Sequence, residues 1–310
     1  MKSRSDGRAA LLALLLGLVG CRTVTETEGD RESPAMEQTV IVDNMLIRYR
    51  TNEPSGSVRA AGATTPILMI HGWMGSSYDY QQLLDLLPAS IQAVAPDMPG
   101  SGESEKRNVK YTMDFFVDFI DHFLEALSMP TVVLVGHSFG GAIAVHYAAT
   151  RPDRVSRLVL IDPDGLSREE GFLDWLRRRE VLVDLLSALN NRAAVSLALR
   201  LQVFHHPTLV TKEMVAAVER TGLEPDGRRA QRELAKRVVG RYPVDALLPG
   251  LQMPVLLIWG RNDRVLSSKW AARFMELLPD ARLEMVDECG HMPQIEAVRR
   301  VADLLLADAE

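Results

Sequence analysis

Short, mostly apolar runs that alternate with helical stretches are the feature that most constrains how this 310-residue chain can fold. Runs of this kind suit strands that are buried on both faces. Alternation of such strands with helices predicts an α/β fold, with a mostly parallel sheet and helices on both of its faces. The predicted strands are Pro66–Ile70, Ile91–Ala95, Thr131–Val135, Val155–Ile161, Val255–Trp259 and Leu283–Val286, and helices are predicted over Tyr80–Leu87, Met113–Leu127 and Ala142–Ala149.

A hairpin is expected before the first of these strands. Thr39–Val42 and Met45–Tyr49 read as two short strands, and Asp43-Asn44 between them is a turn-forming pair. With this hairpin the predicted core covers residues 38–164 and 246–310.

One long interval interrupts the alternation. Residues 165–245 contain helical stretches at Phe172–Leu189, Arg192–Val203 and Lys212–Arg220 but no clear strand. An insertion of this length between two strands is too long for a simple loop. We therefore expect a helical cap over residues 165–245.

The N-terminus has the pattern of an export signal. Basic residues precede an apolar run, Ala9–Gly20, that is shorter than the roughly 20 residues needed to span a hydrocarbon core. The run ends Leu-Val-Gly-Cys, which resembles the lipobox of bacterial lipoproteins. That resemblance implies a signal peptide over residues 1–20, lipidation of Cys21 and a polar tether over residues 21–37. A plain signal peptide with an incidental cysteine is the alternative.

Composition excludes several function classes. The formal net charge is −6 and the pI is about 5.7, which gives no support for a nucleic-acid-binding surface. Two cysteines cannot build a disulfide framework or a cysteine-rich zinc site. No motif indicates a metal or an organic cofactor, so none is expected.

The segment Gly136-His137-Ser138-Phe139-Gly140-Gly141 lies directly between a predicted strand and a predicted helix. A G-x-S-x-G sequence in this position predicts a sharp turn that exposes a strained serine at the start of the helix. The N-terminus of the helix favours a developing negative charge. Ser138 is therefore the candidate nucleophile.

A serine hydroxyl needs a base and an orienting carboxylate to act as a nucleophile. Asp263 and His291 each follow a predicted strand, where ligands gather in open α/β sheets, and they occur in the order Ser, acid, His. Asp162 also ends a strand and competes with Asp263 as the acid. The other histidines, which we expect not to act as the base, are His71, His122, His137, His146, His205 and His206; the adjacent pair His205-His206 is expected on the cap surface rather than at a metal.

From residue 38 to its end, the chain resembles the α/β-hydrolase fold family, with a cap inserted between two strands. The resemblance rests on four motifs in the family's order, namely His71-Gly72, the Ser138 turn, the Asp263 turn and the His291 loop. Some family members place the acid at the position of Asp162.

The resemblance implies a role for each motif. Ser138 would attack a carbonyl carbon, His291 would take and return its proton, and Asp263 would hold the imidazole. The backbone N–H groups of Trp73 and Phe139 would form the oxyanion hole.

A serine nucleophile disfavours the epoxide and halide chemistry of relatives that use aspartate. The expected activity is hydrolysis of small-molecule or lipid carboxylic esters through an acyl-enzyme. Alternatives are amide or carbon–carbon bond hydrolysis on the same triad, or a ligand-binding or signalling protein on a hydrolase scaffold. Trp73-Met74-Gly75 and Met292 differ from the usual pattern of the carbon–carbon hydrolases. The lipidated Cys21 would place the protein in the bacterial cell envelope, and no obligate protein partner is expected.

Overall fold

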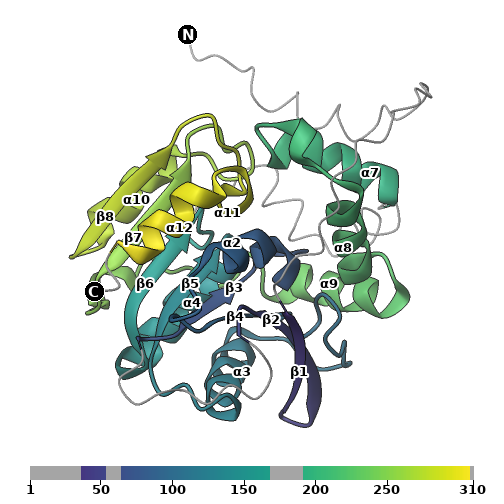
Figure 1. Ribbon diagram of the computed structural model, residues 1–310, viewed down its shortest axis with the longest axis horizontal. Coiled ribbons are helices and arrows are strands. Elements are labelled where there is room, and N and C mark those ends of the chain that lie inside the picture. Colours follow the sequence, from purple (N-terminus) through teal and green to yellow (C-terminus); the bar gives the residue numbers. More distant parts are fainter. Residues whose placement is uncertain (1–35, 54–63, 168–190, 308–310) are drawn as a thin grey trace. The chain divides into compact units, whose positions relative to one another are not determined.

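An eight-stranded sheet organises the chain (Figure 1). The computed structural model describes residues 36–53, 64–167 and 191–307. The strand order is β1-β2-β4-β3-β5-β6-β7-β8; β1 and β2 pair antiparallel, β2 pairs antiparallel with β4, and all other neighbours are parallel. The strands are β1 (Met36–Val42), β2 (Met45–Thr51), β3 (Ile67–Ile70), β4 (Ala93–Pro96), β5 (Val132–His137), β6 (Val155–Ile161), β7 (Val255–Gly260) and β8 (Ala281–Val286).

Both faces of the sheet are covered, which confirms the predicted α/β class. Successive residues of a strand point to opposite faces; Leu68 and Ile70 join one apolar cluster, whereas Ile67 and Met69 join another. The first cluster includes residues of α3 (Met113–Ala126), α4 (Phe139–Thr150) and α10 (Lys269–Leu277), and the second includes residues of α2 (Gln81–Leu86) and α12 (Val298–Leu306). Short helices complete the core at η1 (Ser77–Tyr80), η2 (Pro152–Arg154), η5 (Leu248–Gly250) and α11 (Pro293–Glu296).

The predicted hairpin is present. Asp43 and Asn44 have φ angles of 50° and 61°, as the right-handed twist of a two-residue hairpin requires. The hairpin is longer than expected, because Met36 already pairs with Thr51. The sheet therefore begins at Met36, two residues before the predicted start of the core at residue 38.

The described residues between β6 and β7 form helices and no strand. Apolar side chains of the first part of this segment form a small cluster that includes Phe204, Val210 and Met214, with Met292 from the core, whereas Ala230 and Leu234 join the first cluster of the core. The predicted helix at Phe172–Leu189 lies outside the described residues. The helices of this part are α7 (Arg192–Ala198), the π-helical turn η3 (Leu199–Val203), η4 (Pro207–Leu209), α8 (Lys212–Gly222) and α9 (Pro225–Arg237).

Helices α7, α8 and α9 each begin at a residue type that favours a helix N-terminus. The side chains of Asn191 and Thr211 accept the N–H groups of Ala194 and Met214, so α7 and α8 both begin with an N-cap. Helix α9 is too polar for an apolar pattern to reveal, and it begins at Pro225, whose missing N–H costs nothing in the first turn.

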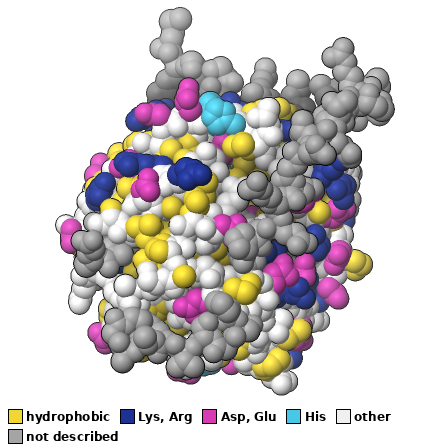
Figure 2. Space-filling model, in the orientation of Figure 1, with side chains coloured by type: hydrophobic (Ala, Val, Ile, Leu, Met, Phe, Trp, Pro, Cys, Tyr) yellow, Lys and Arg dark blue, Asp and Glu magenta, His cyan; other side chains and the backbone are white. Residues whose placement is uncertain are grey.

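Within the described residues, no helix is both long enough and apolar enough to cross a membrane. Residues 1–20 and Cys21 lie outside the described residues, so the signal peptide and the lipidation remain predictions. On the face that Figure 2 shows, basic and acidic side chains occur together rather than in a patch of one sign.

Candidate active site

Ser138 lies on a strained turn between β5 and α4. Its φ and ψ angles are 53° and −121°, a region that side-chain-bearing residues rarely occupy. The backbone N–H of Ser138 donates to the carbonyl of Ile161 at 3.0 Å, which fixes the turn against β6. Gly140 is required here because a Cβ atom at that position would lie 2.4 Å from the carbonyl oxygen of Ile70. The turn is the one that the G-x-S-x-G sequence predicts.

Ser138, His291 and Asp263 form one chain of hydrogen bonds. The Nε2 atom of His291 lies 3.0 Å from Ser138 Oγ, and its Nδ1 atom lies 2.7 Å from Asp263 Oδ2. The other oxygen of Asp263 accepts the N–H groups of Val265 and Leu266 at 2.7 and 2.8 Å. Asp263 and His291 are both buried. This geometry allows the imidazole to take a proton from the hydroxyl while the carboxylate stabilises the cation that results.

The sheet brings these residues together from distant parts of the sequence. Strands β5, β6, β7 and β8 are parallel neighbours, so their carboxyl ends meet at one edge. Ser138 follows β5, Asp263 follows β7 and His291 follows β8. The three side chains therefore meet at one edge of the sheet, although they are far apart in the sequence.

Asp162, the competing acid, lies close to the same histidine but plays a different part. It is fully buried at the end of β6, and its Oδ1 accepts the N–H of Gly260 at 2.9 Å. Its Oδ2 has no hydrogen-bond partner. Burial, followed by the negative charge of Asp263, raises the pKa of Asp162 well above its usual value. A carboxyl group with a raised pKa ionises less readily, and Asp162 makes no hydrogen bond to His291, so the geometry favours Asp263.

The loop that carries Trp73 is held by His71. The Nε2 atom of His71 accepts the N–H of Met98 at 3.0 Å, so its proton lies on Nδ1, which donates to the carbonyl of Gly72 at 2.8 Å. Burial lowers the pKa of His71, which keeps the ring neutral. Among the described residues the N–H of Trp73 has no acceptor.

Trp73 and Phe139 line the same pocket. Phe139 is the first residue of α4, where backbone N–H groups have no acceptor within the helix. The pocket holds about 250 Å³ of empty space, part of it open to solvent. Its walls are mainly apolar, with polar groups from His71, Ser101 and Gln231, and no Lys or Arg belongs to its described lining; the apolar walls include Met98, Phe116, Ile143 and Leu234.

The remaining histidines of the site are structural. His137 donates from Nε2 to the carbonyl of His291 at 2.7 Å, and burial lowers its pKa well below the usual value. His137, Asp162 and His291 are the one group of possible metal ligands that lies close together within the described chain. Both ring nitrogens of His291 already contact Ser138 and Asp263, so only two atoms of that group are free.

Glu296 supports the His291 loop, and the sequence analysis does not find it. One carboxylate oxygen accepts the N–H of Gly290 at 2.8 Å, and the other accepts the N–H groups of His205 and His206 at 2.7 and 3.0 Å. The N–H of His291 donates to the carbonyl of Val203 at 2.8 Å. Residues 203–206 of the insertion thus help to fix the loop that carries His291. These partners are far apart in sequence, so no local pattern signals them.

A mostly parallel sheet, with a serine on a strained strand-to-helix turn and with an aspartate and a histidine after later strands, defines the class of α/β hydrolases. The chain belongs to that family, because the family model described as the alpha/beta hydrolase fold matches residues 65–298.

Relatives within the family differ in the bond that they cleave. The chain is 30% identical over 266 residues to 2-hydroxymuconate semialdehyde hydrolase of Pseudomonas sp. (strain CF600), covering 81% of this chain and 89% of that protein. Two solved structures share the fold at 24% identity. One is a bacterial membrane phospholipase A, with a TM-score of 0.69 and coverage of 88% of this chain and 85% of the other. The other is a meta-cleavage product hydrolase from Pseudomonas fluorescens IP01, with a TM-score of 0.71 and coverage of 87% and 96%.

Proposed function

We propose that this hydrolase cleaves carboxylic esters through an acyl-enzyme on Ser138. The observation that carries the proposal is the hydrogen-bonded chain Ser138–His291–Asp263. It is supported by the pocket that Trp73 and Phe139 share beside it.

The reaction follows from this geometry. Ser138 Oγ attacks the ester carbonyl carbon while its proton moves to His291 Nε2. The N–H groups of Trp73 and Phe139 stabilise the oxyanion of the tetrahedral intermediate. His291 then gives the proton to the departing alcohol, and the C–O bond breaks to leave the acyl group on Ser138. Water attacks the acyl-enzyme in the second half, losing its proton to His291, and this proton returns to Ser138 as the acid leaves.

The pocket predicts a preference for short acyl groups. Its empty space of about 250 Å³ includes open solvent, and the large side chains of Phe116, Phe139 and Leu234 line its described walls, so little room is left for a long chain. On a series of p-nitrophenyl esters, we expect kcat/KM to fall by at least about tenfold between butyrate and laurate, because each methylene that does not fit costs 1 kcal/mol or more. A fluorophosphonate should label Ser138 in the same preparation. A rate that is flat or rises with chain length would contradict the assignment of this pocket.

The same experiment separates the alternatives. Labelling of Ser138 without turnover of any ester or anilide would favour a carbon–carbon substrate. Tight binding of a ligand without labelling or turnover would favour a binding protein.

Carbon–carbon hydrolysis is the second candidate, because of the likeness to the muconate semialdehyde hydrolase. A muconate-type substrate carries a carboxylate, and buried anions require a cationic or hydrogen-bonding partner. The described lining of the pocket offers polar groups of Ser101 and Gln231 but no Lys or Arg to balance the charge. Because no cationic partner for a carboxylate belongs to the described lining, we rank ester cleavage above carbon–carbon cleavage.

We further propose that Cys21 carries a lipid and anchors the enzyme in the bacterial cell envelope. Two acyl chains give stable anchoring where one gives only reversible binding. Mass spectrometry of the mature N-terminus should find a diacylated Cys21, and Cys21→Ser should release the protein from membranes. A mature protein that begins elsewhere and is unmodified would disprove the anchor.

A further inference from the structure

The C-terminal end of helix α8 contacts the loop that carries Trp73. Thr221, in the last turn of α8, is fully buried. Its hydroxyl donates to the carbonyl of Gly75 at 3.3 Å and accepts the N–H of Gly102 at 3.1 Å. A buried hydroxyl destabilises the fold unless it is hydrogen-bonded, and here the hydroxyl both donates and accepts. Thr221 therefore joins the insertion to two separate loops of the core.

The residue beside Thr221 makes a second contact with the same loop. Met74 has a φ angle of 65°, which is costly for a residue with a side chain. Its side chain lies against Gly222, where a Cβ atom would be only 2.2 Å from Met74 Cε. Met74 directly follows Trp73 in a turn that the N–H of Gly75 closes on the carbonyl of Gly72 at 3.1 Å, so contacts to Met74 and Gly75 help to hold the turn that carries the Trp73 N–H.

The turn over residues 98–102 provides a further link to the same loop. Met98 donates its N–H to His71, as described above, and Gly102 donates to Thr221. Gln231 of α9 donates from Nε2 to the carbonyl of Gly100 at 2.8 Å and to Ser101 Oγ at 3.0 Å. Both α8 and α9 thus hold the turn that holds His71.

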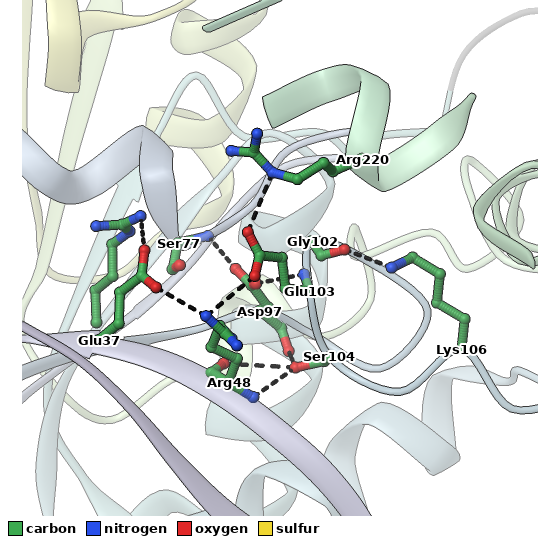
Figure 3. Close-up of polar contacts among 10 residues, drawn as sticks. Glu37, Arg48, Ser77, Asp97, Gly102, Glu103, Ser104, Lys106 and Arg220 are labelled. Carbon is green, nitrogen blue, oxygen red and sulfur yellow. Dashed lines mark hydrogen bonds and ion pairs between the residues drawn. The ribbon is translucent and has the colours of Figure 1, made fainter. Parts of the chain in front are cut away.

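Figure 3 shows the contacts of Asp97, the residue directly before the turn over residues 98–102. Asp97 accepts the N–H groups of Ser77 and Glu103, each at 2.7 Å, and the side chain of Glu103 pairs with Arg220 of α8 at 3.2 Å. The ion pair is partly exposed and contributes little by itself. The buried hydroxyl of Thr221, the next residue along α8, is the specific contact.

We propose that Thr221 is a positioning residue for the oxyanion hole. It holds the carbonyl of Gly75, and with Gly222 it holds Met74, so that the N–H of Trp73 faces the position of the oxyanion. The insertion then completes the catalytic geometry as well as bordering the pocket. This inference rests on the proposed acyl transfer at Ser138.

The test removes the hydroxyl and keeps the shape. In Thr221→Val, kcat for p-nitrophenyl butyrate should fall about tenfold or more with KM changed less than about threefold, since loss of a complete oxyanion donor costs about 10²–10³ in kcat. Affinity for an alkyl boronic acid, which forms an anionic tetrahedral adduct on Ser138, should fall by the same factor. Thr221→Ser should recover both values.

The matched control is Thr211→Val at the other end of the same helix. It removes the N-cap hydrogen bond to Met214 and should lower Tm without changing kcat. If Thr221→Val does not fold, Thr221→Ala provides the second test, because it removes the same hydroxyl without adding a methyl group between the two loops, and it should lower kcat and boronate affinity together.

The outcomes are distinguishable. Wild-type kcat and boronate affinity in folded Thr221→Val, or in folded Thr221→Ala if that variant is used, would overturn the inference while leaving the proposed function intact. A wild-type protein that neither hydrolyses esters nor reacts with a fluorophosphonate would overturn the proposed function, and the inference with it.

Discussion

Replacement of Ser138 by alanine should lower ester turnover by about 10⁴-fold or more, because the acyl-enzyme cannot form and only binding and oxyanion stabilisation remain. The fold should survive, since the hydroxyl contributes one hydrogen bond to His291, and alanine removes no backbone contact. Initial rates on p-nitrophenyl butyrate, measured beside the uncatalysed reaction, give the comparison.

The control for this prediction is Ser268→Ala. Ser268 is half-buried, away from the triad, and its hydroxyl donates to the carbonyl of Arg261 at 3.2 Å. This variant should keep wild-type turnover and fluorophosphonate labelling, whereas Ser138→Ala should lose both. Retention of even a tenth of the wild-type rate by Ser138→Ala would show that another group is the nucleophile.

The largest effect after that of Ser138 is expected at Asp263. In Asp263→Asn the amide cannot stabilise the imidazolium and favours the wrong tautomer of His291, so kcat should fall by about 10⁴-fold. Asp162→Asn should keep kcat within about threefold, because Asp162 makes no hydrogen bond to Ser138 or His291 and an amide of similar shape still accepts the Gly260 N–H. Equal losses in both variants, or a larger loss at Asp162, would reassign the acid.

Stability adds an independent measurement at Asp162. The folded state binds the Asp162 proton up to a higher pH than the unfolded state, whose aspartate pKa is about 3.9. Stability of the wild type therefore falls as pH rises above about 4 through this group. Asparagine does not titrate, so Tm of Asp162→Asn minus that of the wild type should increase from pH 4.5 to pH 7.5. A difference that stays constant would mean that Asp162 is ionised in the fold.

Local sequence patterns were sufficient for the sheet and for the position of the nucleophile. Strands buried on both faces leave continuous apolar runs, and a strand-to-helix turn with no room for side chains leaves glycines on either side of Ser138. Each pattern spans only a few consecutive residues, so it can be recognised in the sequence without knowledge of the tertiary structure. Helix α9 left no such signal because its surface is mostly polar.

The sequence by itself determined the fold class, the strand-to-helix turn at Ser138 and the candidates for acid and base, because each depends on residues close together in the chain. It favoured Asp263 as the acid but left Asp162 as a competitor, since both end a strand. Only the tertiary structure separated them, by burying one carboxyl group without a partner for Oδ2 and placing the other 2.7 Å from His291. The same holds for Glu296 and Thr221, whose partners lie in distant segments and meet only when the insertion packs on the core.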